Sequence, residues 1–261
     1  MSRSIGDQLR DKVAVVTGAR RGIGRATALE LGANGAAVVV ADNEGESELK
    51  EVAQQLRTNG GRASWVLADV RSRTSVKGLV DAAIRNFGTL DILVNNAGVE
   101  SVVPLLELSD EEWTRVIDTD LMGTFVCLQE ASRAMVAHGH GGAIVNLGSV
   151  QTRVVLTGRA HYAVAKRAVE TLTAHAANEL SVYGIRVHTV NPGMIATAMT
   201  EAVRGDPAAL RKATSRIAMG RPGEPEEVAR VIAFLVSDRA SYMTGQSVYV
   251  DGGYALGWGG R

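Results

Sequence analysis

The chain has 261 residues, enough for one large domain with a sizeable buried core. Its 28 basic and 28 acidic residues give a formal net charge of zero, which argues against a broad basic surface for nucleic acid or an anionic membrane. The single Cys127 excludes an internal disulfide framework, and the first residues lack the apolar stretch of a signal peptide, so we expect a cytoplasmic protein.

Short apolar runs alternate with longer helical patterns along the chain. The runs VAVVT from Val13 and AAVVVA from Ala36 are apolar throughout, which is typical of strands covered on both faces of a parallel sheet. Strands are predicted at residues 13–17, 37–41, 63–67, 92–95, 143–147, 186–190 and 247–250.

Terminal signals bound the helices between these strands. Ser109 and Glu112 have capping-box spacing at the start of a long helix, Pro225 suits a first turn, and Gly60 and Gly184 suit positions just after helix ends. Helices are predicted at residues 24–34, 44–58, 75–86, 109–138, 162–182 and 225–236.

The alternation of strands and helices predicts an α/β doubly wound fold, with a parallel sheet covered by helices on both faces. No linker or repeat divides the chain, so residues 1–261 are expected to form one domain. The stretch 194–220 is the only long irregular insertion, and we expect it to be a substrate loop or lid.

Glycine is enriched, at 29 residues, and three glycines follow the first predicted strand in the pattern G18-A-R-R-G22-I-G24. Glycines at this turn let the backbone approach a pyrophosphate, which the free N–H groups and the helix dipole then bind. Because the spacing differs from GxGxxG, a tight structural turn is the alternative. The strand before and the helix after favour the dinucleotide site.

Asp42 follows the second predicted strand. A carboxylate there accepts hydrogen bonds from the adenosine ribose hydroxyls and repels a 2′-phosphate, which favours NAD over NADP. Arg20 and Arg21 in the glycine turn leave NADP open, because either side chain could pair with a 2′-phosphate.

Polar residues with catalytic potential lie at or beyond later strands. The amides of N95-N96-A97-G98 end the fourth strand, Ser149 follows the fifth, and Tyr162 and Lys166 share a helix face. A phenol is a poor base at neutral pH because its pKa is about 10, and a nearby ammonium lowers that pKa. Tyr162 could then exchange a proton with an alcohol or a carbonyl oxygen held by Ser149.

The ordered set of motifs resembles the compact, single-domain short-chain dehydrogenases/reductases. The similarity runs from Lys12 to Gly253 and includes the 13-residue spacing from Ser149 to Tyr162. It rests on TGxxxGxG at residues 17–24, Asp42, Asp69-Val70, NNAG at residues 95–98, Ser149, Tyr162, Lys166, and NPG at residues 191–193 followed by Thr197. The resemblance implies a Rossmann-like sheet of seven parallel strands in the order 3-2-1-4-5-6-7.

The resemblance also implies residue roles. Tyr162 would be the acid/base, Ser149 would orient the substrate, and Lys166 would lower the tyrosine pKa and bind the nicotinamide ribose. The expected cofactor-binding set is Gly18, Arg20, Arg21, Gly22, Ile23, Gly24, Asp42, Asp69, Val70, Asn95, Ala97, Gly98, Tyr162, Lys166, Pro192, Gly193, Ile195 and Thr197.

Asp120 departs from the family pattern, which usually has an asparagine in this place to steady a water relay to the lysine. An ionised aspartate accepts hydrogen bonds but cannot donate them, and beside Lys166 it would change the local electrostatics. We therefore include Asp120 in the catalytic set and expect a shifted pH optimum.

Three further polar residues, Glu100, Gln151 and His161, lie next to the motif segments. As a group they predict a polar pocket mouth, with exposed loop positions as the alternative. No metal site is predicted, because no set of ligands converges in the sequence.

The leading interpretation is an oxidoreductase that interconverts a secondary alcohol and a ketone with NAD(H), on a small sugar, polyol or hydroxy acid. Two alternatives are an NADPH-dependent 3-oxoacyl-thioester reductase and a non-catalytic NAD(H)-binding sensor. The former is disfavoured because Tyr183 stands where reductases of carrier-protein thioesters often have a basic residue. Family members pair their two long helices across two-fold axes, which implies a homotetramer. The zero net charge predicts a small-molecule substrate and no nucleic-acid or membrane partner.

Overall fold

A computed structural model describes residues 8–257, and these residues contain one seven-stranded parallel sheet. The strand order is β3-β2-β1-β4-β5-β6-β7, which confirms the predicted Rossmann-like topology. The strands are β1 (Val13–Thr17), β2 (Ala37–Asp42), β3 (Arg62–Leu67), β4 (Ile92–Asn95), β5 (Gly142–Leu147), β6 (Ile185–Pro192) and β7 (Ser247–Val250).

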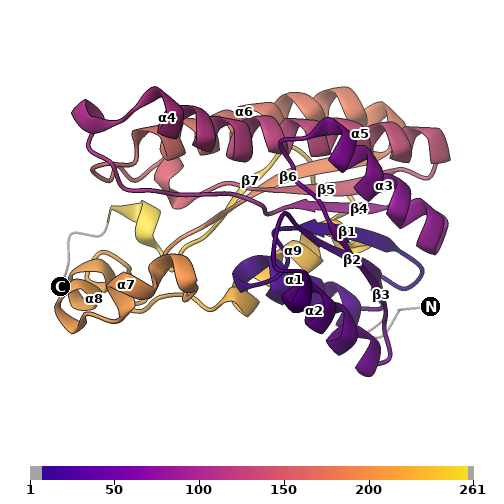
Figure 1. Cartoon of the computed structure of the whole chain (residues 1–261), viewed down its shortest axis with the longest axis horizontal. Coiled ribbons are helices and arrows are strands. Elements are labelled where there is room, and N and C mark those ends of the chain that lie inside the picture. Colours follow the sequence, from indigo (N-terminus) through magenta and orange to yellow (C-terminus); the bar gives the residue numbers. More distant parts are fainter. Residues whose placement is uncertain (1–7, 258–261) are drawn as a thin grey trace.

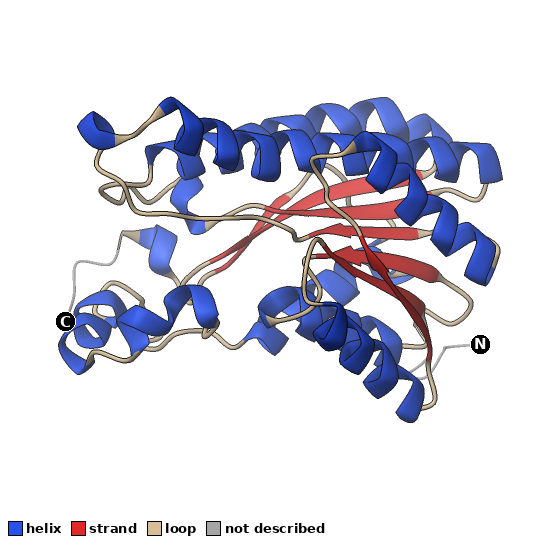
Figure 2. Ribbon diagram, viewed as in Figure 1, coloured by secondary structure: helices blue, strands red, loops and turns tan. Residues whose placement is uncertain are grey.

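Helices form a layer on each face of the sheet (Figures 1 and 2). One layer contains α1 (Gly22–Ala33), α2 (Glu46–Thr58) and α9 (Pro225–Val236). The other contains α3 (Arg73–Phe87), α5 (Gly123–His138) and α6 (Ala160–Leu180).

The apolar central strands contribute side chains to the hydrophobic core on both faces of the sheet. In β2, Val38 and Val40 belong to the core beneath α1 and α2, whereas Val39 and Ala41 belong to the core beneath α3 and α5. Alternate strand residues point to opposite faces, so a strand that is apolar at every position buries both sides. This arrangement leaves the carboxyl ends of the strands as the edge that is open to a ligand.

The long helix predicted over 109–138 contains a π-helical turn. It runs as α4 (Asp110–Val116), the π segment Ile117–Met122 and α5. The predicted capping box is only half formed: the Ser109 hydroxyl accepts the N–H of Glu112, but the Glu112 carboxylate accepts from Ser101 and Arg115 instead. Such π turns are frequent at functional sites, and this one contains Asp120.

The stretch 194–220, expected to be irregular, contains two short helices, α7 (Glu201–Arg204) and α8 (Pro207–Thr214). The Asp206 carboxylate caps α8 by accepting the N–H of Ala208 at 2.8 Å, and Pro207 occupies the first turn. An N-cap aspartate followed by proline is a helix-start signal, and the sequence interpretation missed it. Both helices lie beyond the carboxyl end of the sheet (Figure 1).

Within residues 8–257 no helix combines the length and apolar character needed to cross a membrane.

Candidate active site

Two adjoining cavities lie at the carboxyl edge of the sheet. A groove of about 640 Å³ passes the glycine turn and the end of β2, and a cavity of about 250 Å³ lies beside Ser149 and Tyr162. Ile23, Asn96 and Thr197 line both of them. A ligand can therefore extend from the groove into the smaller cavity.

The glycine turn has a backbone that other residues cannot adopt without strain. Gly18 and Gly22 have φ values of +63° and +57°, and a Cβ on Gly24 would collide with the Gly18 carbonyl oxygen. The Asn96 side chain fixes the turn by donating to the Thr17 and Gly18 carbonyls at 3.0 and 2.9 Å. Close backbone at the start of α1 is the geometry that a pyrophosphate requires, so these residues fit a dinucleotide.

At the end of β2, Asp42 faces this groove next to Arg20. The Arg20 Nε lies 3.6 Å from the Asp42 carboxylate, and the same guanidinium pairs with Glu44. Burial raises the pKa of Asp42, while the Arg20 charge acts in the opposite direction. Arg21 is exposed and also lines the groove. The positive charge of Arg20 is thus already paired with the carboxylates of Asp42 and Glu44.

The adenine side of the groove matches the expected set with one exception. Asp69, Val70, Ala97 and Gly98 all line the groove. Asn95 does not: its buried amide donates to Asn146 at 2.8 Å, within the sheet. The prediction for Asn95 is corrected in this respect, because it is the last residue of β4 and its side chain points into the packed layer rather than over the strand end.

The expected nicotinamide end lines the smaller cavity. Pro192, Gly193, Ile195 and Thr197 all contribute to its wall. Gly193 is required by packing, since a Cβ there would lie 2.7 Å from the Asp251 Cα. Met194, Met199 and Val203 from the 194–220 stretch also line the cavity, so this stretch covers the site.

Ser149, Tyr162 and Lys166 meet at the inner wall of the smaller cavity, and all three are buried. The Ser149 hydroxyl accepts the N–H of Gln151 at 3.2 Å, and its interaction with Tyr162 acts to lower the pKa of the phenol. The Lys166 Nζ donates to the Leu147 carbonyl at 3.0 Å and lies 5.5 Å from the centroid of the Tyr162 ring. The expected Ser–Tyr–Lys set is thus assembled by the end of β5 and the first turns of α6.

Asp120 forms a buried ion pair with this set. Its Oδ2 lies 3.0 Å from the Lys166 Nζ, its Oδ1 accepts the N–H of Val99 at 2.8 Å, and its side chain is fully buried. The π turn brings the carboxylate to this position. The sequence-based expectation that Asp120 meets Lys166 is confirmed in its geometry.

The pKa of Tyr162 differs from the expectation. Burial raises the pKa of the Tyr162 phenol, the Asp120 carboxylate raises it further, and the hydrogen bond with Ser149 and the Arg159 charge oppose this rise. The sequence interpretation had Lys166 lower the pKa. In this structure the charge of Lys166 is paired with Asp120, so the expected lowering is not found.

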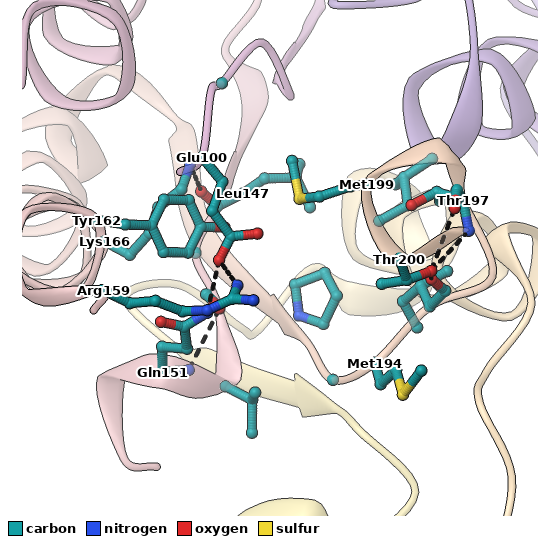
Figure 3. A pocket seen from close by; sticks show the side chains of 18 of the residues that line it. Glu100, Leu147, Gln151, Arg159, Tyr162, Lys166, Met194, Thr197, Met199 and Thr200 are labelled. Atoms are coloured by element: carbon teal, nitrogen blue, oxygen red, sulfur yellow. Dashed lines mark hydrogen bonds and ion pairs between the residues drawn. The ribbon is translucent and has the colours of Figure 1, made fainter. Parts of the chain in front are cut away.

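Of the three residues predicted at the pocket mouth, two line the cavity. The Gln151 Nε2 donates to the Glu100 carboxylate at 2.8 Å, and both side chains face Tyr162 (Figure 3). His161 is wrong as a substrate contact: it is fully buried, and its Nε2 lies 2.8 Å from the Ser101 Oγ. Adjacent helix residues point about 100° apart, which turns His161 away from the cavity.

The sequence interpretation missed several lining residues, above all Arg159. Its guanidinium pairs with Glu100 inside the cavity (Figure 3). The available signal was its spacing, because residues three apart lie on one side of a helix and Arg159 precedes Tyr162 by three. Asn96 was named among the strand-end amides but left out of the cofactor-binding set, and it lines both cavities. Tyr254 was missed because it comes from a C-terminal segment without a motif. Of the glycine-rich tail, residues 258–261 lie outside the described residues.

Comparison with known proteins agrees with this geometry. Residues 18–255 match a family model described as enoyl-(acyl carrier protein) reductase. The chain is 46% identical to a cis-4-hydroxycyclohexanecarboxylate dehydrogenase of Sinomonas cyclohexanicum, over 96% of this chain and 99% of the relative. It is 38% identical to a 3-oxoacyl-[acyl-carrier-protein] reductase of Staphylococcus aureus, over 93% of this chain and 97% of the relative.

A solved structure gives the same result. A short-chain type dehydrogenase/reductase from Mycobacterium marinum superposes with a TM-score of 0.90 at 37% sequence identity, and the match covers 96% of this chain and 99% of the other.

Proposed function

Because the chain belongs to the short-chain dehydrogenase/reductase family, we propose that it oxidises the secondary hydroxyl of a small cyclic hydroxy acid with NAD. Family membership makes it an oxidoreductase that interconverts a secondary alcohol and a ketone with a nicotinamide cofactor. The substrate class is supported by the relative at 46% identity, whose name specifies a hydroxylated cyclohexanecarboxylate.

The observation that carries the proposal is the meeting of buried Ser149, Tyr162 and Lys166 in one cavity that adjoins the groove. In the proposed roles, the Ser149 hydroxyl orients the substrate oxygen and Tyr162 takes its proton during oxidation or returns it during reduction. Lys166 and Asp120 set the electrostatics around the phenol. The nicotinamide, when bound, supplies the hydride acceptor or donor.

The remaining residues hold the cofactor and cover the site. The cradle formed by Gly18, Gly22 and Gly24 would hold the pyrophosphate, and Asp42 would meet the adenosine ribose. Thr197 would contact the nicotinamide end, and the segment from Met194 to Val203 would exclude water from the reacting atoms.

A substrate panel tests this proposal. We expect turnover of cis- or trans-4-hydroxycyclohexanecarboxylate with NAD. The absorbance of the NADH that forms measures this turnover. A 3-oxoacyl thioester assayed with NADPH tests the alternative, which the relative at 38% identity supports. Preferential reduction of the thioester would replace the proposed function with that alternative. Tight NADH binding without turnover of any alcohol or ketone would favour the sensor.

Cofactor preference gives a separate prediction. We expect wild-type kcat/KM to be higher with NAD than with NADP, because Asp42 accepts from the ribose hydroxyls and repels a 2′-phosphate. Asp42→Ala should reduce this preference by about tenfold or more, since it removes the carboxylate and frees Arg20 to meet the phosphate. The measurement is kcat/KM for each cofactor at a fixed substrate concentration.

Glu48→Ala is the matched control for Asp42→Ala. Glu48 lies 4.0 Å from Arg20 but does not line the groove, so its loss should leave the preference unchanged. A wild-type enzyme that prefers NADP would contradict the assignment of Asp42.

Two broader properties also remain proposals. We propose a homotetramer that pairs the α4–α5 helix and α6 with copies in neighbouring subunits, and a cytoplasmic location consistent with the single buried Cys127. Light scattering of the purified protein measures the assembly.

A further inference from the structure

We propose that Arg159 binds the carboxylate of the substrate and that Glu100 occupies the same guanidinium, so that the two residues have opposite effects on the binding of acidic substrates. This inference rests on the proposed function and adds a carboxylate-binding site to it.

Arg159 lies beside the reacting group of the cavity. It directly precedes α6, three residues before Tyr162, and its guanidinium lies in the cavity in front of the Tyr162 ring (Figure 3). Arg159 and Tyr162 line the same cavity, and the Arg159 charge acts to lower the pKa of the Tyr162 phenol. A substrate whose hydroxyl meets Tyr162 can therefore reach Arg159 with a second polar group.

Most of the hydrogen-bonding capacity of this guanidinium is unused. An arginine has five N–H donors. Within residues 8–257 the only partner found for the Arg159 side chain is the Glu100 carboxylate, which is bound through Nη1. The Arg159 side chain is nevertheless only 25% exposed. A planar guanidinium with free donors in a sheltered site suits bidentate binding of a carboxylate.

The other charges that line the cavity are already paired. Lys166 is bound to Asp120 at 3.0 Å, which leaves Arg159 with Glu100 as the pair that faces an incoming charge. The cavity wall also includes Leu156, Met194 and Met199, which are apolar, and Met194 and Met199 lie across the cavity from Arg159 and Tyr162 (Figure 3). A substrate with a hydrocarbon ring, a hydroxyl and a carboxylate matches this combination of an apolar wall with polar groups on the facing side.

Glu100 opposes binding of such a substrate. Its side chain is 10% exposed, and its Oε1 is shared between Arg159 and the Gln151 amide. A substrate carboxylate at Arg159 would either displace Glu100 or be repelled by it, so removal of the Glu100 charge should favour the acid. An ion pair that is only structural would behave differently, because loss of either partner would then impair the site in the same direction.

The test compares an acidic and a neutral substrate in the full-length enzyme. The substrates are 4-hydroxycyclohexanecarboxylate and cyclohexanol, and kcat and KM are measured for both. We expect Arg159→Gln to lower the ratio of kcat/KM for the acid to that for cyclohexanol by about 30-fold, mainly through KM for the acid. Because the Arg159 charge also acts to lower the pKa of Tyr162, a loss of kcat should be shared by both substrates. Arg159→Lys should recover part of the loss, since it restores the charge without the fork.

Glu100→Gln should change KM for the acid in the opposite direction to Arg159→Gln. It keeps the shape of the side chain and its contact with Gln151, and we expect it to lower KM for the acid by about threefold or more, with cyclohexanol unaffected. Arg153→Gln is the matched control, because Arg153 is exposed, stacks on the Tyr249 ring at 4.2 Å and does not line the cavity. It should leave both substrates unchanged.

Each outcome decides the inference. If Glu100→Gln and Arg159→Gln both weaken turnover of the acid, or if Arg159→Gln affects acid and cyclohexanol equally, the carboxylate site is overturned while the proposed dehydrogenase function stands. If the wild-type enzyme oxidises neither compound, the proposed function fails and the inference fails with it. Should Arg159→Gln not fold, the opposite shifts expected of Arg159→Lys and Glu100→Gln give the same decision.

Discussion

Replacing Tyr162 with phenylalanine is expected to abolish alcohol oxidation while NADH binding persists. The substitution removes only the hydroxyl, which is the group that exchanges a proton with the substrate oxygen. General acid–base catalysis contributes about 10²–10⁴-fold to a rate, so kcat should fall by about this factor. The ring would still pack against Val116 and Ala165, so the cavity should keep its shape.

The measurement needs both turnover and binding. Steady-state kcat reports the chemistry, and titration of the protein with NADH by fluorescence reports whether the groove is intact. Tyr249→Phe is a matched control: it also removes a half-buried hydrogen-bonding hydroxyl, which donates to Glu170 at 3.0 Å, but Tyr249 lies outside the cavity that contains Tyr162. Substantial turnover by Tyr162→Phe would disprove the acid/base assignment.

The sequence predicted the sheet well, most clearly in the central strands β1, β2 and β4, which are buried on both faces. The bounds of β1, β4 and β7 agree with the predicted runs, and the others differ by one or two residues at an end. Uninterrupted apolar runs bounded by polar residues leave little freedom in where such a strand begins. The right-handed connections predicted a parallel sheet with helices on both faces, and the family resemblance implied the strand order.

The helical segments show the limit of pattern reading. The π turn at residues 117–122 adds a local irregularity that a periodicity of 3.6 cannot specify, and its one buried residue is Asp120. Helices α7 and α8 have only 4 and 8 residues, too few to establish a helical periodicity, and the start signal of α8 at Asp206 was missed.

In the active site, motifs were predictable and their surroundings were not. Ser149, Tyr162 and Lys166 were found because their spacing along β5 and α6 is fixed by the fold. Arg159 and Tyr254 were missed because loop and C-terminal residues reach the cavity through tertiary packing. His161 was wrongly assigned to the pocket because neighbouring residues on a helix point to different faces, so a residue next to Tyr162 in the sequence need not face the same cavity.

Asp120 stands where the family pattern has an asparagine, and its carboxylate changes the pKa of Tyr162 in a definite direction. The fully buried carboxylate adds to the burial that raises the pKa of Tyr162. Asparagine at this position would keep the side-chain shape and remove the charge. We therefore expect Asp120→Asn to lower the pKa of Tyr162, and Lys166, no longer paired, would act in the same direction while it stays protonated.

The direction in which the pH profile of activity moves follows from the two roles of the Tyr162 phenol. Oxidation of an alcohol needs ionised Tyr162, so its rate rises with pH through the pKa, and a lower pKa moves this rise to lower pH. Reduction of the ketone needs protonated Tyr162, so its fall with pH also moves to lower pH. The expected displacement is about one pH unit, measured as log kcat/KM against pH in both directions.

Loss of a carboxylate from a buried pair also costs stability, which could by itself alter activity. Breaking such a pair on one side costs about 3–5 kcal/mol, so the thermal midpoint of Asp120→Asn should fall. Glu130→Gln is the matched control, because Glu130 is 7% exposed, pairs with Arg73 and Arg133, and lies away from both cavities. A destabilised Glu130→Gln with an unchanged pH profile would isolate the electrostatic effect. If Asp120→Asn left rate and pH profile unchanged, the carboxylate would have no part in controlling Tyr162.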